Sequence, residues 1–505
     1  MSRRRVAVVT IGVMLSLFLA AMEATVVATA MPTIVSQLGG LSSYSWVFSA
    51  YMLASTTTVP LFGKLSDLYG RRPIYAVAMV LFLIGSLLCG QAQSMGQLIT
   101  FRALQGLGAG GLLPLAFIIV GDLFTFEQRA RMQGLFSGVW GVSSIVGPLL
   151  GGFLVDQVSW HWVFFINVPP GLLAGALVWL AWVDRQRADG AARPAVDFVG
   201  AGLLTAAVIA LLLGLFELGT SASWALLALA AVLFAALAWA EWRAADPILP
   251  LPLFRDRMFA VACAHGLLAG WAMFGSTAFV PLFVQAVLGT SATAAGATLT
   301  PLMLGWVGAS IVGSRLLLHI GYRTLAMIGM VMLTLGTFLM TRIGMGATQF
   351  SLMINVALMG IGMGLSVPAF LIAVQSAVPR RVLGTATSTV QFSRSIGGVL
   401  GVSVMGAFLS LRLAALLRAA GLDPAAVDLN SLLDPLARAS AGALDEALRR
   451  ALAGAIQGVF AIALGAAALG LVATTLAPAG RIAQLADRRA QAEEESAAAP
   501  VSITE

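Results

Sequence analysis

An acidic residue, Glu23, lies within an apolar stretch that runs from Val6 to Met31. A charge at bilayer depth costs about 3 kcal/mol or more, so an acid there is expected to have a function. Glu23 lies roughly 12 Å short of Pro32 at a rise of 1.5 Å per residue, too far for its carboxylate to reach water at the helix end. We therefore expect Glu23 to face a polar cavity and to bind a proton or a cation.

The stretch around Glu23 is one of many apolar stretches in this chain. The 505 residues are 59% hydrophobic and 10% charged, whereas soluble proteins carry about 25% charged residues. Apolar runs of about 20 residues predict an all-α polytopic membrane protein. The candidate spans are 6–31, 46–63, 74–91, 98–121, 132–155, 163–183, 199–217, 223–242, 258–282, 293–318, 324–343, 350–376, 385–411 and 451–476.

The net charge of +7 follows the loops between these spans. Basic residues gather in alternate loops, as in Arg71 and Arg72 after the second span, and apart from Arg342 the short intervening loops carry none. Only the long segment 412–450 breaks this pattern, and long loops cross the membrane largely regardless of charge. We therefore expect both termini to be cytoplasmic. We attribute the net positive charge to the orientation of the loops across the membrane rather than to nucleic-acid binding.

The spans divide into two sets of six with an inserted pair between them. Residues 1–184 and 258–476 each hold six spans, and 185–257 holds the pair with its flanking loops. The tail 477–505 is expected to be disordered in its acidic last part. Weak internal symmetry supports this division, because the loop after the second span has a basic, glycine-containing counterpart at 314–323. Repeated six-span halves indicate a transporter with a substrate site near midplane.

The loop after the second span has the sequence GKLSDLYGRRP, starting at Gly63. Gly63 and Gly70 permit a tight turn, and Asp67 can accept hydrogen bonds from nearby arginines or from a helix N-terminus. The spacing of the glycines, the acid and the basic pair Arg71 and Arg72 resembles the signature loop of the major facilitator superfamily. That resemblance implies the major facilitator fold and a gating contact that is made in one conformation and broken in the other.

Further motifs resemble those of the fourteen-span drug:proton antiporters of that superfamily. The stretch from Glu23 to Pro32 resembles their first-span motif, which usually has aspartate at the place of Glu23, and a proton-coupling role is implied. The run around Arg102 resembles the fourth-span motif, and the segment 160–169, with Asn167, also resembles this subfamily. The fifth span has the small residues and proline of the antiporter pattern, although Ser143 replaces one expected glycine: Gly134, Gly147, Pro148, Gly151 and Gly152.

Two arginines lie well inside the predicted spans, away from their ends. Arg102 and Glu23 both fall roughly 9–12 Å below the outer boundary at 1.5 Å per residue, so they can pair when the acid is ionised. Arg102 is interpreted as a modulator of the proton on Glu23 or as a structural counter-ion. Arg394, roughly 14 Å into its span, is interpreted as a structural partner or as a residue of a central cavity. Other candidates for the wall of that cavity are Trp46, Tyr51, Trp140, Trp271, Phe274, Gln285 and Trp306.

Together these features predict a monomeric, proton-coupled antiporter of the bacterial cytoplasmic membrane that exports hydrophobic or cationic drugs by alternating access. The alternatives are an exporter of one physiological substrate, such as a lipid, siderophore or amino acid, and a proton-coupled nutrient symporter. An enzyme is disfavoured because the spans contain no nucleophile–base pair. Neither the two cysteines nor the three scattered histidines suggest a metal site, and we expect no cofactor and no nucleic-acid partner.

Overall fold

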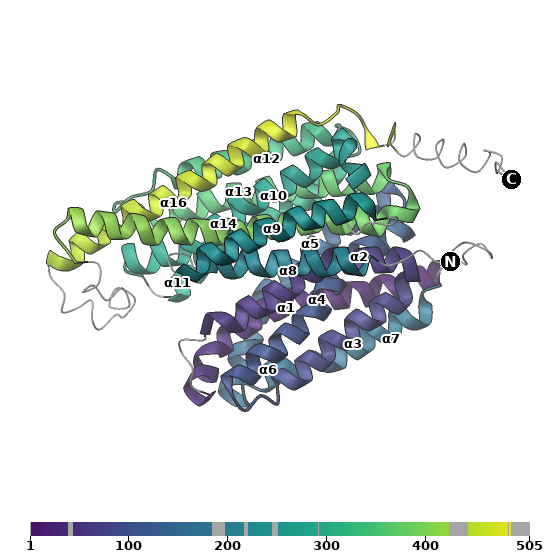
Figure 1. Ribbon diagram of the computed structural model, residues 1–505, viewed down its shortest axis with the longest axis horizontal. Coiled ribbons are helices and arrows are strands. Elements are labelled where there is room, and N and C mark those ends of the chain that lie inside the picture. Colours follow the sequence, from purple (N-terminus) through teal and green to yellow (C-terminus); the bar gives the residue numbers. More distant parts are fainter. Residues whose placement is uncertain are drawn as a thin grey trace.

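The structure is a computed structural model that describes residues 2–38, 44–183, 197–216, 221–244, 251–290, 292–423, 443–482 and 484–485. Every element within these ranges is helical (Figure 1). The first helices are α1 (Arg3–Leu38), α2 (Tyr44–Tyr69), α3 (Arg71–Cys89), α4 (Met95–Leu123), α5 (Phe126–Gln157), α6 (Trp162–Phe165) and α7 (Val168–Ala181). The next two are α8 (Phe198–Phe216) and α9 (Ser221–Arg243). The last are α10 (Arg257–Leu282), α11 (Ala292–Leu316), α12 (Tyr322–Met340), α13 (Gln349–Ala377), α14 (Leu383–Ala419) and α16 (Ala443–Thr475), with short turns η2 (Leu251–Arg255), η3 (Phe283–Val287) and η4 (Arg380–Val382).

Each predicted span coincides with a helix, the sixth with α6 and α7 together. Eleven helical segments are long and apolar enough to cross a membrane, and residues 199–215 of α8 form a shorter apolar helix. The helices α2 and α5 fall outside this set. The helical, membrane-spanning class is therefore confirmed, while the count of fourteen spans and the orientation of the termini stay predictions.

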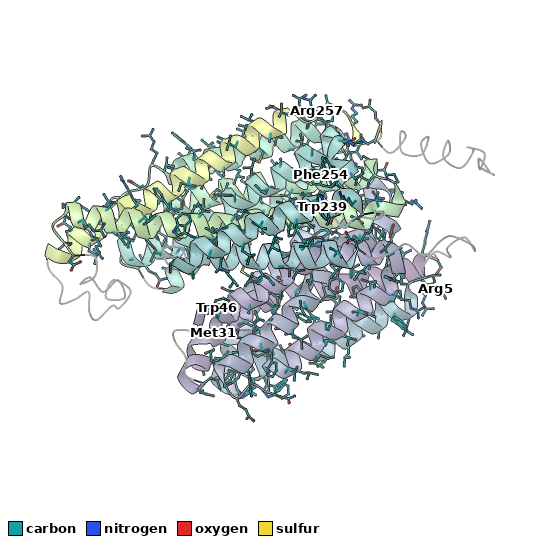
Figure 2. All side chains as sticks on the ribbon, viewed as in Figure 1. Arg5, Met31, Trp46, Trp239, Phe254 and Arg257 are labelled. Atoms are coloured by element: carbon teal, nitrogen blue, oxygen red, sulfur yellow. The ribbon has the colours of Figure 1, made fainter. Side chains whose placement is uncertain are left out.

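The helices form two bundles that meet along α2, α5, α11 and α14. We call α1–α7 the N-terminal bundle and α10–α16 the C-terminal bundle. Figure 1 shows that the two bundles diverge away from the end at which α1 begins. Figure 2 shows Arg5 and Arg257 toward that end and Met31 and Trp46 toward the other. The predicted boundary at residue 184 lies outside the described residues.

Glycines on α4 bring its neighbours unusually close. A Cβ at Gly106 would lie 2.5 Å from the carbonyl oxygen of Tyr51 on α2, and one at Gly108 would lie 2.3 Å from the backbone nitrogen of Phe82 on α3. Only small residues permit such close backbone contact between helices. This packing places α4, and with it Arg102, at the centre of the N-terminal bundle.

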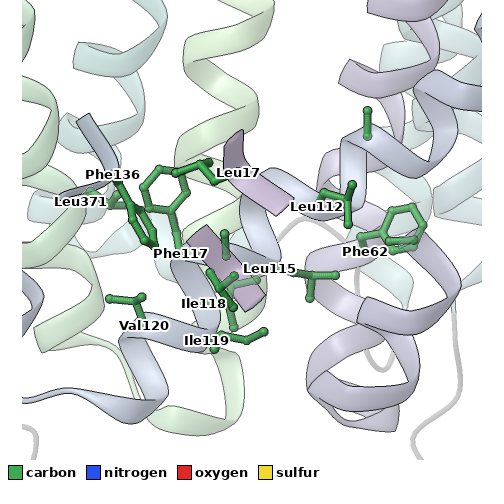
Figure 3. Packing of buried hydrophobic residues seen from close by; sticks show 14 of the residues in the cluster. Leu17, Phe62, Leu112, Leu115, Phe117, Ile118, Ile119, Val120, Phe136 and Leu371 are labelled. Carbon is green, nitrogen blue, oxygen red and sulfur yellow. The ribbon is translucent and has the colours of Figure 1, made fainter. Parts of the chain in front are cut away.

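Apolar side chains fill the boundary between the bundles near the end that carries Arg5. Phe117 of α4 and Phe136 of α5 meet edge to face, with ring centroids 5.4 Å apart. Figure 3 shows Leu371 of α13 beside these rings, so that one core cluster includes residues of both bundles. The bundles therefore pack directly against each other at this level.

The inserted pair lies beside the boundary between the bundles. Leu204 and Val208 of α8 share an apolar cluster with Leu53 of α2 and with Ile396 and Val399 of α14. Because α8 contacts one boundary helix from each bundle, the pair covers this side of the boundary.

In the long segment 412–450, residues 412–419 continue α14 and residues 443–450 form the first turns of α16. Residues 424–442 and most of the tail lie outside the described residues. The two cysteines, Cys89 in α3 and Cys263 in α10, are free thiols and buried.

Candidate functional site

Glu23 lies in the middle of α1 and is 1% exposed. Its Oε1 accepts a hydrogen bond from Nη1 of Arg102, so the two side chains form a buried ion pair between α1 and α4. Its Oε2 accepts from Nδ2 of Asn167, just before α7, at 2.6 Å. Both carboxylate oxygens are therefore held, and each by a different helix segment.

Arg102 has further partners besides Glu23. Its Nε donates to the carbonyl oxygen of Val47 at 3.2 Å, and Nη1 donates to Oε1 of Gln105 at 2.7 Å. The guanidinium carbon lies 4.2 Å from the ring centroid of Tyr51 on α2, a cation–π contact. These neutral partners can hold the guanidinium in place whether or not Glu23 carries a charge.

A second group of neutral side chains supports the acid. Ser86 of α3 accepts from Asn167 Nδ2 at 3.0 Å and from Gln105 Nε2 at 3.2 Å, and its hydroxyl donates to the carbonyl oxygen of Phe164 at 2.8 Å. Ser86, Gln105 and Asn167 are fully buried. We call Glu23, Arg102, Gln105, Ser86 and Asn167 the Glu23 network. Asn167 Oδ1 is a buried acceptor of the network that has no hydrogen-bond partner within the described part of the chain.

The sequence predicted Glu23 and Arg102 but gave no role to Ser86 or Asn167. Charged residues stand out in an apolar run, whereas serine and asparagine are tolerated there in many packing contexts. The available signal for Asn167 was its place in the segment 160–169, which also holds Trp160. The indole of Trp160 is buried and donates to Oε1 of Gln37 at 2.8 Å, which ties this segment to the end of α1.

Asp67, near the end of α2, joins the two bundles. It accepts from the backbone N–H groups of Gly384 at 3.0 Å and Thr385 at 2.7 Å, and from the Thr385 hydroxyl at 2.8 Å. Both residues lie in the first turn of α14, where the unpaired N–H groups and the helix dipole favour an anion. Arg71 Nη1 donates to Asp67 Oδ1 at 2.6 Å from within the same bundle.

Arg71 is fixed by a second acid, because its Nε donates to Asp122 Oδ2 on α4 at 2.8 Å. Burial raises the pKa of Asp67 above its ordinary value. The charge of Arg71 and the N–H of Thr385 lower this pKa in part. These donors therefore stabilise the carboxylate against the cost of burial. We call this arrangement, with Gly384 and Thr385, the Asp67 contact.

The other residues of the predicted gating set have different places. Gly70 has φ 95°, a left-handed conformation that favours glycine, and it forms the turn between α2 and α3. Gly63 is not part of that turn, because it lies inside α2, where a Cβ would come 2.0 Å from Ser388 Oγ on α14. Its lack of a side chain permits the close approach of α14. The guanidinium carbon of Arg72 lies 4.2 Å from the ring centroid of Trp179, a cation–π contact.

Arg129 makes a second polar contact between the bundles. From α5 it donates through Nε to the carbonyl oxygen of Phe124 at 2.9 Å and through Nη2 to that of Gly121, both at the end of α4. Its Nη1 donates to the carbonyl oxygen of Gln375 near the end of α13, at 3.0 Å. Gln375 in turn donates to the carbonyl oxygen of Phe117 at 3.2 Å. The sequence gives no sign of this role for Arg129, because carbonyl acceptors leave no trace in a residue pattern.

The antiporter pattern of α5 has mixed surroundings. Gly134 faces Ile311 of α11 across an ordinary contact distance of 3.4 Å, and Gly147 and Gly151 are buried. Gly152 has open space where a Cβ would lie. Ser143, in place of an expected glycine, donates to the carbonyl oxygen of Val139 at 2.9 Å and is buried. The side chain of Pro148 lies outside the described part of the structure.

The predicted cavity residues come from several helices of both bundles, and their shared site stays a prediction. Trp46 packs in the cluster with α8, Tyr51 stacks on Arg102, and Trp271 packs with residues of α16. The remaining four aromatic and polar candidates are spread over different helices: Trp140 on α5, Phe274 on α10, Trp306 on α11 and Gln285 in η3. Apolar residues pack in many arrangements, so a list of aromatics does not specify a shared wall.

Arg394 is the charged candidate of this set, in the middle of α14 and partly accessible. Within the described residues it has no hydrogen-bond or ion-pair partner, and its interpretation as a structural partner or as a cavity residue stays a prediction.

Comparison with known proteins extends these observations. The sequence pattern of the Major Facilitator Superfamily matches residues 13–402. The chain is 39% identical over 409 residues to multidrug transporter protein MdtP of Bacillus subtilis (strain 168), an alignment that covers 79% of this chain and 75% of that protein. It is also 39% identical over 406 residues to multidrug resistance protein 3 of the same organism, covering 79% of this chain and 78% of that protein.

A similar fold occurs in a solved structure, that of a bacterial homolog to the human lysosomal transporter Spinster in an inward-facing and unoccupied conformation. It superimposes with a TM-score of 0.59 and 17% identity, covering 94% of this chain and 98% of that one. At this identity the likeness concerns the fold alone.

Proposed function

Because this chain belongs to the Major Facilitator Superfamily, we propose that it is a proton-coupled antiporter that exports drugs or other amphipathic compounds across the cytoplasmic membrane by alternating access. Two relatives at 39% identity bear multidrug names, which supports efflux of such compounds. The observation that carries the coupling is the burial of Glu23 in an ion pair with Arg102.

The proton would be carried by Glu23. When the carboxylate is ionised, Arg102 and Asn167 donate to its two oxygens. When a proton binds, Glu23 becomes a donor, and Arg102 keeps Val47 O and Gln105 Oε1 as acceptors. A half-turn of the Asn167 amide would place Oδ1, which has no partner within the described residues, where Nδ2 now lies. The network can therefore accommodate both protonation states with its helices in place.

Alternating access would proceed by breaking and remaking the contacts at the end of the molecule where the bundles meet. The Asp67 contact and Arg129 both join the bundles there, and the distribution of arginines predicts that this end is cytoplasmic. In this arrangement the cytoplasmic side is closed. Opening it requires Asp67 to leave the first turn of α14 and Arg129 to release the end of α13.

The coupling is tested by transport in proteoliposomes with an imposed proton gradient and a panel of amphipathic compounds. Glu23→Gln keeps the size and hydrogen bonding of the side chain but cannot ionise, so it should abolish uphill efflux while leaving substrate binding measurable. Glu23→Asp should retain partial activity because it keeps the carboxylate. Glu446→Gln, the same change at an exposed acid of α16, is the matched control and should transport like the wild type.

Proton release provides a second measurement. Substrate added to the wild-type protein in detergent should release protons, and Glu23→Gln should release far fewer. A Glu23→Gln protein that still drives gradient-dependent efflux would refute this mechanism of coupling.

A further inference from the structure

Among the described charges that lie well inside the helices, Glu23 and Arg102 neutralise each other, whereas Arg394 makes no ion pair within the described residues. We propose that Arg394 is a binding site for a negatively charged group of the transported compound, so that amphipathic carboxylates are preferred substrates. This inference rests on the proposed transport function and specifies its substrate class.

The backbone of Arg394 is held firmly against α10. A Cβ at Gly270 would lie 2.2 Å from the carbonyl oxygen of Arg394, and one at Gly397 would lie 2.0 Å from the carbonyl oxygen of Leu267. The side chain of Arg394 passes Gly270, with its Cγ 3.3 Å from the same Cβ position. The close packing at Gly270 and Gly397 therefore fixes the position of the Arg394 backbone against α10.

Arg394 is partly accessible and makes no hydrogen bond or ion pair within the residues that the structure describes. Arg394 lies roughly 17 Å into α14 at 1.5 Å per residue, too deep for the head group to reach water at the near helix end. A charge at this depth is costly unless an opposite charge neutralises it.

No protein acid is available for that purpose in the described helices. Away from helix ends, Glu23 is the one acidic side chain described, and Arg102 and Asn167 occupy both its oxygens. A second donor without a described acceptor, the buried indole N–H of Trp271, lies one residue beyond Gly270 on α10. An unpaired cation favours a ligand that brings a negative charge and acceptor atoms, and it disfavours a cationic ligand.

The proposal is tested with two fluorescent probes that differ by one charge, dansylglycine and its methyl ester. Binding is measured by fluorescence in phosphatidylcholine nanodiscs without a proton gradient. The wild type should bind the acid about tenfold more tightly than the ester, and Arg394→Gln should lose this preference through weaker binding of the acid alone. Arg394→Lys keeps the charge and should keep most of the preference. Arg342→Gln, at the end of α12, is the control and should bind like the wild type.

Three results would overturn the proposal. The first is a wild type that binds the acid no better than the ester, which needs no variant and is independent of folding. The second is an Arg394→Gln protein that loses affinity for both probes equally. The third is loss of acid binding when phosphatidylglycerol is added to the nanodiscs, which would assign the anion to a lipid headgroup. If the proposed proton coupling is wrong, the wild type will show no gradient-driven efflux. It will still bind the acid probe more tightly than the ester in nanodiscs.

Discussion

Arg102 of the N-terminal bundle and Arg394 of the C-terminal bundle both lie well inside long helices, yet their surroundings differ. Arg102 contacts Glu23, Gln105, the carbonyl oxygen of Val47 and the ring of Tyr51. Arg394 has no such partner within the described residues and is partly accessible. This difference agrees with the two proposals: the N-terminal bundle carries the proton-coupling pair Glu23 and Arg102, and the C-terminal bundle carries Arg394 for an anionic ligand.

The same asymmetry holds where the bundles meet. The N-terminal bundle supplies the charged side chains Asp67 and Arg129. The C-terminal bundle supplies uncharged groups, namely backbone groups of Gly384, Thr385 and Gln375, the Thr385 hydroxyl and the Gln375 amide. Each charged side chain meets a helix end of opposite partial charge. The Asp67 carboxylate faces a helix N-terminus, and the Arg129 guanidinium faces a helix C-terminus.

The largest expected effect is on stability at Arg102. Arg102→Gln leaves Glu23 buried without its cationic partner, and breaking a buried ion pair in this way costs about 3 to 5 kcal/mol. We expect a large fall in the thermal unfolding temperature in detergent and no transport. The double variant Glu23→Gln with Arg102→Gln removes both charges and should recover most of the lost stability. If the double variant is as unstable as the single one, the network is not governed by its charge balance.

The next effect concerns Asn167. Asn167→Ala removes the donor to Glu23 Oε2, and a buried hydrogen bond to a charged group contributes about 1.5 to 3 kcal/mol. Thermal unfolding should detect the loss. Asn355→Ala on α13, the same change at a buried asparagine of the other bundle, is the control. Equal losses in the two variants would show that Asn167 has no special relation to the acid.

A smaller effect separates the two sides of the Asp67 contact. Asp67→Asn removes the charge that faces Arg71 and α14, and turnover in proteoliposomes should fall about tenfold while abundance and substrate binding persist. Thr385→Val removes only the hydroxyl donor and keeps the backbone N–H groups, so turnover should fall less than about threefold. Full turnover by Asp67→Asn under a saturating gradient, or a larger loss in Thr385→Val, would contradict this asymmetry.

The smallest effect on stability is expected at Arg394. Because no partner within the described residues loses a bond, Arg394→Gln should change the free energy of unfolding by less than about 1 kcal/mol, or increase it through relief of an unpaired charge. Thermal unfolding of this variant beside Arg102→Gln measures the contrast directly. A destabilisation as large as that of Arg102→Gln would mean that Arg394 has a structural role.

The sequence specified the helices and the charged residues far better than their neutral partners. Glu23 and Arg102 were placed at equal depth from the helical rise alone, and the structure brings them into contact. Asn167 and Ser86 were not recognised, because neutral polar residues interrupt apolar helices without marking a site.

Backbone partners were equally hard to foresee. The N–H groups of Gly384 and Thr385 belong to any helix start, so only the fold shows which helix Asp67 meets. The cavity residues were predicted by residue type, and Trp46 and Trp271 show how little that type says about position, since they pack in separate clusters.

The burial of both cysteines has a practical consequence for following this protein in motion. Cys89 lies in one bundle and Cys263 in the other, and both thiols are shielded by their surroundings. Thiol-reactive spin labels or dyes should therefore attach selectively to cysteines introduced at exposed positions, with the native pair left in place. Pairs of labels at the two ends of the bundles would then report, by changes in their separation, whether one end opens as the other closes.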